Sequence, residues 1–203
     1  MQLCGALTFF RTSLGLKGQL KIKVIKRMRY FRLPWYLGHL VWIHPKEQAL
    51  IPGNVFFMTS LHADVYRNDE HIESRDLGSG VVTNAGVNLM SADWTNATAT
   101  LKAMNWHQSG TSSTAPAVTD TALGAAITGN VTSGVQSNAT NVYTTIATLA
   151  YSAVATVTEW GLFNASTGSG TASMWDHRTF AGIAVDSTTS IKFTYNLTIN
   201  SGG

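Results

Sequence analysis

The segments Thr158-Glu159-Trp160-Gly161-Leu162-Phe163 and Trp175-Asp176-His177-Arg178-Thr179-Phe180 decide the fold of this chain. Each segment carries large aromatic and aliphatic residues of the kind that favour β-strands. Residues 164–170 lie between them, read Asn-Ala-Ser-Thr-Gly-Ser-Gly, and contain turn formers without a bulky apolar side chain. Two apolar runs joined by such a segment predict a β-hairpin with a long loop.

The predicted hairpin carries charges of both signs in its apolar strands. Glu159 lies in the first strand and Arg178 in the second. An ionised carboxylate in an apolar strand is costly unless it is paired. We therefore predict that Glu159 and Arg178 form a structural ion pair across the hairpin, in preference to a catalytic acid.

Aromatic residues in and around the hairpin are candidates for the core or for a contact between subunits. They are Trp106, Trp160, Phe163, Trp175, Phe180, Phe193 and Tyr195. Tryptophan also stacks on sugar rings, so the set Trp94, Trp106, Trp160 and Trp175 leaves a glycan-binding alternative open.

The rest of the chain extends the β pattern. Residues 61–73 predict a hairpin that turns at 67–70, and the other predicted strands cover 100–107, 141–151 and 191–199. Thr83 is expected to cap a short helix over 84–92. Residues 119–123 are expected to form one helical turn, and 129–140 a loop or an irregular edge strand. Many short strands and one or two short helices predict an all-β antiparallel sandwich, of jelly-roll or immunoglobulin-like type.

Charge divides the chain into two unlike parts. Residues 1–57 hold nine Lys and Arg residues and one acid, a net +8, whereas residues 58–203 hold five bases and ten acids, a net −5. We predict a basic and aromatic N-terminal extension over 1–57 and a β-sandwich domain over 58–203. The basic charge belongs to the extension, so we expect no nucleic-acid binding by the folded domain.

Two interpretations of the extension remain open. It is either a basic arm that lies on nucleic acid, on an anionic membrane surface or inside a shell, or an upstream mis-start or disordered arm. Met58 opens a self-sufficient segment where the charge changes, which favours the second interpretation. The sequence contains no run of about 18 apolar residues, so no membrane-spanning helix is predicted. Cys4 is the single cysteine, which excludes an intrachain disulfide.

Patterns that carry enzyme chemistry are missing from the sequence. Asp176-His177 lies in a serine-rich chain, but no Gly-x-Ser-x-Gly nucleophile elbow accompanies it. His62, His71, His107 and His177 are scattered, without the spacing of zinc ligands. We therefore predict no catalytic residue, no cofactor and no metal site.

Five segments carry a recurrent turn-and-strand pattern: residues 81–88, 119–123, 158–164, 176–180 and 191–199, of which the last reads Ile-Lys-Phe-Thr-Tyr-Asn-Leu-Thr-Ile. In these segments the chain resembles a group of small β-sandwich virion proteins of tailed bacteriophages. The resemblance covers about residues 58–203 and leaves 1–57 unmatched. The resemblance implies a structural component of the head-decoration or tail-associated type, without enzymatic activity, in a virion assembled in the bacterial host cytoplasm.

These observations favour a non-enzymatic virion protein that packs as a homo-oligomer on other capsid or tail proteins. We expect a closed trimer, because the few predicted strands leave apolar surface that symmetric assembly would cover. The alternative is a receptor-binding or glycan-binding adhesin module of a tail fibre. Exposed aromatic residues at a loop-rich end would favour the adhesin, and an apolar flank on the sandwich would favour the packing protein.

Overall fold

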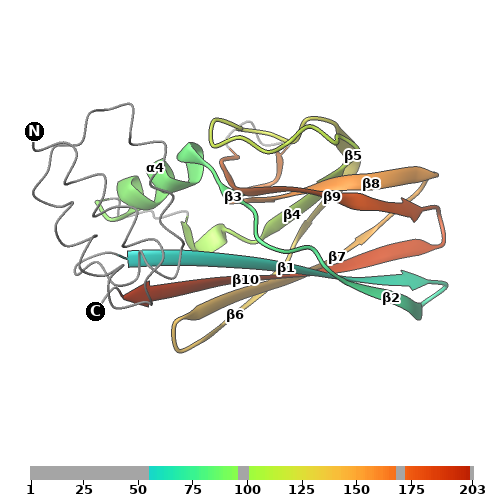
Figure 1. Cartoon of the computed structure of the whole chain (residues 1–203), viewed down its shortest axis with the longest axis horizontal. Helices are drawn as coiled ribbons and strands as arrows, with labels where there is room; N and C mark the ends of the chain where they lie inside the picture. Colours follow the sequence, from blue (N-terminus) through green and yellow to red (C-terminus); the bar gives the residue numbers. More distant parts are fainter. Residues whose placement is uncertain (1–54, 96–100, 168–171, 202–203) are drawn as a thin grey trace, which may run out of the picture. The chain divides into compact units, whose positions relative to one another are not determined.

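The computed structural model describes residues 55–95, 101–167 and 172–201. These residues form a two-layer antiparallel β-sandwich with one α-helix, which confirms the predicted fold class (Figure 1). In chain order, the elements are β1 (Val55–Arg67), β2 (Glu70–Asp76), β3 (Val81–Val82), α4 (Asn84–Asp93), the 3-10 helix η2 (Leu101–Ala103), β4 (Trp106–Gly110), β5 (Ala126–Ser133), β6 (Val135–Ala139), β7 (Val142–Ala150), β8 (Ala155–Phe163), β9 (Met174–Val185) and β10 (Thr189–Ser201).

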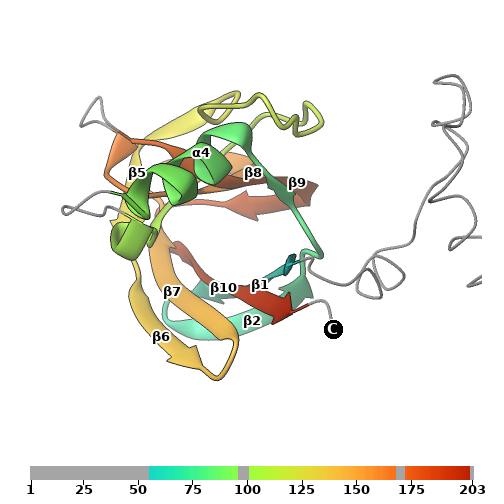
Figure 2. The same cartoon turned by 90° about the vertical axis from the view of Figure 1, so that its left-hand side faces the viewer.

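Two five-stranded sheets form the layers. Sheet A has the strand order β2-β1-β10-β7-β6, and sheet B has the order β3-β9-β8-β4-β5. Figure 2 shows the two layers from the end of the sandwich where α4 lies. The first and last strands, β1 and β10, pair along thirteen residues in the centre of sheet A.

Alternation along β1 and β10 builds the core. The register places Leu61 opposite Tyr195 and Val65 opposite Ile191, and all four side chains are buried. Successive side chains of a strand point to opposite faces, so the residues between them lie on the outer face of sheet A. The period of two over residues 191–199 therefore corresponds to β10, whose alternate side chains are buried in the core.

The first strand begins before the predicted domain boundary. Val55 lies opposite Ser201 and Phe57 opposite Ile199, three to one residues upstream of Met58. Phe57 packs on the core and meets Trp175 edge to face at 6.2 Å. A boundary at Met58 thus cuts through β1. Residues 1–54, with most of the predicted basic extension, lie outside the described residues.

Helix α4 begins where the sequence predicts. The Thr83 hydroxyl accepts a hydrogen bond from the Gly86 N–H at 3.1 Å, as expected of an N-cap, and donates one to the Met174 carbonyl oxygen of β9. A β-carbon on Gly86 would lie 2.9 Å from the Trp175 backbone. Glycine is therefore required at this position for the helix to lie directly on β9.

Two local predictions were wrong. Residues 101–103 form η2, and the strand β4 starts only at Trp106, because the Met104 N–H turns back to bind the Leu101 carbonyl oxygen at 3.0 Å. Residues 119–123 form no helical turn. The Asp120 carboxylate binds the Ala117 N–H at 2.7 Å instead, and such a local side-chain bond competes with helix formation.

Candidate functional site

The β8–β9 hairpin directs its polar side chains to two sides of sheet B. Trp160 pairs with Arg178 and Leu162 with Asp176, whereas Glu159 pairs with Thr179 and Gly161 with His177. Arg178 and Asp176 thus face the core with Trp160, and Glu159 and His177 face the loop of residues 111–125 on the outside. The register shifts between Leu162 and Phe163, which leaves Trp175 as an extra residue that also turns inward.

This arrangement corrects the predicted ion pair. Glu159 and Arg178 are both buried and both paired, but not with each other. Residues 159 and 178 lie on opposite faces of the sheet, because Arg178 is the cross-strand neighbour of Trp160 and not of Glu159. The sequence does not specify how the two strands are aligned. A shift of one residue in the register moves every side chain of a strand to the opposite face of the sheet.

Glu159 and its partners form the outer cluster, which consists of Glu159, His177, Asp120 and three backbone N–H groups. The fully buried carboxylate accepts hydrogen bonds from the N–H groups of Ser112 at 3.1 Å, Gly124 at 2.9 Å and Ala125 at 2.7 Å. It also lies 3.2 Å from His177 Nε2. Glu159 therefore anchors both ends of the 111–125 loop to sheet B.

His177 connects Glu159 to Asp120. Its Nδ1 lies 2.8 Å from the Asp120 carboxylate, and its side chain is almost fully buried. Burial opposes ionisation of Asp120, but hydrogen bonds from the Ala117 N–H and from His177 outweigh it and lower the Asp120 pKa. Both ring nitrogens of His177 contact carboxylates, so the ring is fixed between Asp120 and Glu159. The outer cluster has the arrangement of a structural anchor.

Asp120 is a partner of His177 that the sequence pattern does not predict. The signal was weak, because Asp120 lies in a polar loop more than fifty residues before His177. Gly110 leaves room for the Glu159 carboxylate, because a β-carbon at this position would overlap Glu159 Oε1. A β-carbon on Gly124 would instead lie 2.8 Å from the Ser112 hydroxyl oxygen.

Arg178 and its partners form the inner cluster, which consists of Asp176, Arg178, Tyr195 and Trp175. Arg178 Nε donates to Asp176 Oδ1 at 3.0 Å, and the guanidinium also donates to the Gly78 carbonyl oxygen. Its carbon Cζ lies 5.6 Å from the Tyr195 ring centre, which adds a cation–π contact. Trp175 Nε1 donates to the Tyr195 hydroxyl at 2.8 Å. The cluster thus ties β9 to β10 through the centre of the sandwich.

Burial determines the electrostatics of the inner cluster. Burial raises the pKa of Asp176 above its ordinary value, although Arg178 and neighbouring hydroxyl groups act in the opposite direction. Burial also raises the pKa of the Tyr195 phenol far above its usual range. For the Asp176 carboxylate, desolvation therefore outweighs the pairing with Arg178 and the hydrogen bonds from hydroxyl groups.

Most of the aromatic candidates lie in the interior. Trp160, Phe163, Trp175, Phe193 and Tyr195 are buried. Phe180 is partly buried against the main core, and Trp106 against a smaller core formed by Leu123, Phe163 and Met174. Trp94, at the C-terminal end of α4, is exposed. Of the four tryptophans considered for sugar stacking, Trp94 is the most accessible.

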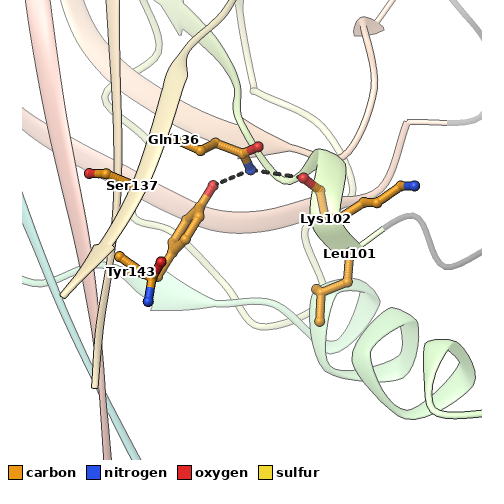
Figure 3. Close-up of a pocket in the computed structure, with 6 residues that line it drawn as sticks. Leu101, Lys102, Gln136, Ser137 and Tyr143 are labelled. Carbon is orange, nitrogen blue, oxygen red and sulfur yellow. Dashed lines mark hydrogen bonds between the residues drawn. The ribbon is translucent and has the colours of Figure 1, made fainter. Parts of the chain in front are cut away.

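A shallow hollow of about 390 Å³ lies between η2 and the β6–β7 hairpin, lined by Leu101, Lys102, Gln136, Ser137, Asn138 and Tyr143. Figure 3 shows that its polar groups are partly engaged with each other. Gln136 Nε2 donates to the Lys102 carbonyl oxygen at 2.9 Å and to the Tyr143 hydroxyl at 2.8 Å. The Asn138 side chain on the same strand makes no such bond within the described part of the chain.

The outer face of sheet A carries a surface cluster of charges. Asp64 lies 2.8 Å from Lys192 Nζ, accepts a hydrogen bond from the Ser74 hydroxyl at 2.7 Å and contacts His62 at 3.1 Å. The Lys192 contact is the main cause of a strongly lowered Asp64 pKa. Neither here nor elsewhere in residues 55–95, 101–167 and 172–201 do His, Cys, Asp and Glu side chains gather as metal ligands.

The comparisons with known proteins and the search for membrane spans give no assignment. No family of proteins, no curated protein and no solved structure matches this chain. Among the helices of the described residues, none combines the length and the apolar character that crossing a membrane requires.

The role of Glu159 as a loop anchor predicts a selective effect of Glu159→Gln. Even with the amide oxygen directed at Ser112 and Ala125, the NH₂ group would face the Gly124 N–H in place of an acceptor oxygen. We therefore expect a loss of roughly 2–3 kcal/mol in the free energy of unfolding. Amide hydrogen exchange at Ser112, Gly124 and Ala125 should accelerate. Urea titration and exchange by NMR measure both effects.

The exposed carboxylate of Glu73 provides the matched control, because Glu73→Gln alters a surface contact with Arg75. This control should leave the free energy of unfolding close to that of the wild type, because solvent screens an exposed ion pair. Equal stabilities and equal exchange rates in the two variants would show that Glu159 does not hold the loop.

Proposed function

We propose that this chain is a non-enzymatic structural protein of a tailed-bacteriophage virion, which acts by packing as a homo-oligomer on the capsid or the tail. The observation that carries the proposal is the engagement of the polar residues of the β8–β9 hairpin by the domain itself. His177 lies between two carboxylates, and Arg178 binds Asp176 and Gly78. Residues that would attract a catalytic interpretation therefore serve the rigidity of the sandwich.

The character of the surface supports a packing role. Strands β5, β6 and β7 contain no charged residue and are rich in Thr, Ser, Asn, Ala and Val. Val135 and Ile146 are exposed next to each other on the outer face of sheet A. An uncharged flank with exposed aliphatic side chains suits contact with a neighbouring protein, as the sequence analysis expected of a packing protein.

A glycan-binding adhesin is the second candidate, and the hollow at Tyr143 favours it. Asn138 is among the residues that line the hollow. Figure 3 shows Lys102 and the ring of Tyr143 at the same hollow. Exposed Trp94 adds a ring that could stack on a sugar. Against this candidate, the Tyr143 hydroxyl and the Gln136 amide nitrogen already bind groups of the chain itself.

Binding of the purified full-length chain to phage particles tests the proposal. Particles stripped of the protein should rebind it in a sedimentation assay, and microscopy of labelled particles should place it on the head or the tail. The Lys102→Ala variant serves as a control, because it removes a side chain of the hollow that lies outside β6 and should leave particle binding unchanged. A chain that ignores stripped particles but is retained on a glycan array, with retention lost in Lys102→Ala, would replace the proposal with the adhesin.

A further inference from the structure

Strand β6 is an open edge of sheet A. All five of its residues are exposed, and β7 is its one neighbour in the described sheets. Figures 1 and 2 both show β6 at the margin of its layer. In an antiparallel ladder, alternate residues direct their N–H and C=O groups away from the paired strand. These groups of β6 form no hydrogen bond with other described residues.

The other three sheet edges carry features that block strand addition. Strand β2 is charged along its length, with Glu70, Glu73, Arg75 and Asp76. Strand β3 has two residues and leads directly into α4. Strand β5 is irregular, with Gly129 at a φ of +74° and a register shift opposite β4. Charge, shortness and bulges are the devices by which proteins prevent pairing at an edge.

Strand β6 has none of these features. Its sequence Val-Gln-Ser-Asn-Ala contains no charge and no proline, and its register with β7 is regular. The strand is also held in shape, because the Gln136 amide is fixed on Lys102 and Tyr143. An ordered, neutral and exposed edge strand loses little conformational entropy when another strand pairs with it.

We propose that β6 pairs antiparallel with β6 of a second copy of this chain, an inference that rests on the proposed homo-oligomer and names its contact. A second copy fits because β6 is self-complementary about Ser137. A two-fold axis at Ser137 places Val135 opposite Ala139 and Gln136 opposite Asn138 of the partner. No like charges meet in this register, and two isologous patches close into a pair.

The pairing joins two copies of sheet A into one continuous sheet. Apolar contact comes from the outer face, where exposed Val135 lies beside Ile146. The contact joins copies in pairs, so we expect a dimer in place of the trimer that the sequence analysis predicted. Five residues per copy form a contact smaller than a standard interface. The dimer should therefore be weak in solution and strengthened by the high local concentration on a particle.

Analytical ultracentrifugation of the full-length chain tests the proposal across a range of concentrations. The wild type should sediment as a monomer–dimer equilibrium. Ser137→Lys places two ammonium groups at the two-fold axis and should raise the dissociation constant at least about tenfold. Ile72→Lys puts the same exposed charge on the protected edge strand β2 and should leave the dimer unchanged. The thermal unfolding midpoints of both variants should match that of the wild type.

A cysteine at the axis gives an independent test. In a background of Cys4→Ser, which removes the one native cysteine, Ser137→Cys should form an interchain disulfide. Residues paired across an antiparallel ladder have Cα atoms about 4.5–5.5 Å apart, within the range of disulfides. Ile72→Cys in the same background should not form this crosslink.

Several outcomes would overturn the pairing: a wild type that stays monomeric, a trimer, or association that Ser137→Lys leaves unchanged. A monomer whose particle binding is lost in Ser137→Lys would also overturn it, and would assign the edge to a different virion protein. A monomer that binds particles with or without the lysine refutes the β6 contact and leaves the proposed function intact. A β6-dependent dimer that ignores particles supports the contact and refutes the function.

Discussion

We expect Arg178→Ala to reduce the free energy of unfolding by about 3–5 kcal/mol, because it leaves a buried carboxylate without its cation. Asp176 is fully buried, and its ion-pair partner is Arg178. The substitution would also leave the Gly78 carbonyl oxygen without the guanidinium that binds it. Replacement of both members, Asp176→Leu with Arg178→Met, should recover most of the loss, since no charge then stays buried. Urea titration followed by circular dichroism measures both variants.

The matched control is Arg75→Ala, at an arginine that is also held by a carboxylate and by backbone carbonyl groups. Arg75 pairs with Glu73 and donates to the carbonyl oxygens of Ala181 and Gly182, but both charged groups are partly exposed. Solvent screens such a pair, so we expect a loss of less than about 1 kcal/mol. Equal losses in Arg178→Ala and in the double replacement would contradict the interaction of Asp176 with Arg178.

The inner cluster contributes more to specificity than to stability. Burial raises the pKa of Asp176 even beside Arg178, which indicates that desolvation outweighs the pairing. An apolar replacement of such a pair is often neutral or stabilising. The cluster instead requires Asp176 and Trp175 to face Tyr195 of the opposite sheet. We expect the cluster to favour one alignment of the two layers over others that a purely apolar core would allow.

The elements with a strong period or a specific cap could be predicted from the sequence. Residues 191–199 alternate apolar and polar side chains, which predicts β10. Thr83 precedes a helical run, which predicts α4. Both signals are local, because a strand face and an N-cap depend on residues within a few positions of each other.

The partners of the charged residues could not be predicted, because they depend on register. Bulges in β9 at Trp175 and at residues 180–182 shift its pairing with β8, and no local pattern marks them. The faces of Glu159 and Arg178 cannot be assigned until the positions of these bulges are known. Asp120 reaches His177 only because the 111–125 loop folds over sheet B, and no sequence pattern predicts this fold of the loop. The same limit applies to β6, whose open edge becomes visible only when the strand order is known.

We expect His107 to make the stability of the fold sensitive to mild acid. His107 lies in β4, fully buried, with Nε2 3.1 Å from the Thr145 hydroxyl of the opposite sheet and its ring 5.3 Å from that of Trp160. Burial lowers the pKa of His107 to about 3, so the folded protein holds the ring neutral. The unfolded chain binds a proton below its pKa of about 6.5. The contribution of His107 to stability is therefore fully present above pH 6.5 and is lost as the pH falls.

Each pH unit below 6.5 should reduce the free energy of unfolding by up to about 1.4 kcal/mol, which amounts to about 2 kcal/mol at pH 5 and about 5 kcal/mol at pH 3. The comparison of the wild type with His107→Gln between pH 6.5 and 5 assigns the slope to this histidine. Urea titrations at half-unit steps should show this slope in the wild type and a much flatter curve in His107→Gln, whose amide can still reach Thr145. His71→Gln, at an exposed histidine of β2, is the control that should keep the slope of the wild type. Parallel curves for the wild type and His107→Gln would mean that His107 is not the group that makes the sandwich sensitive to acid.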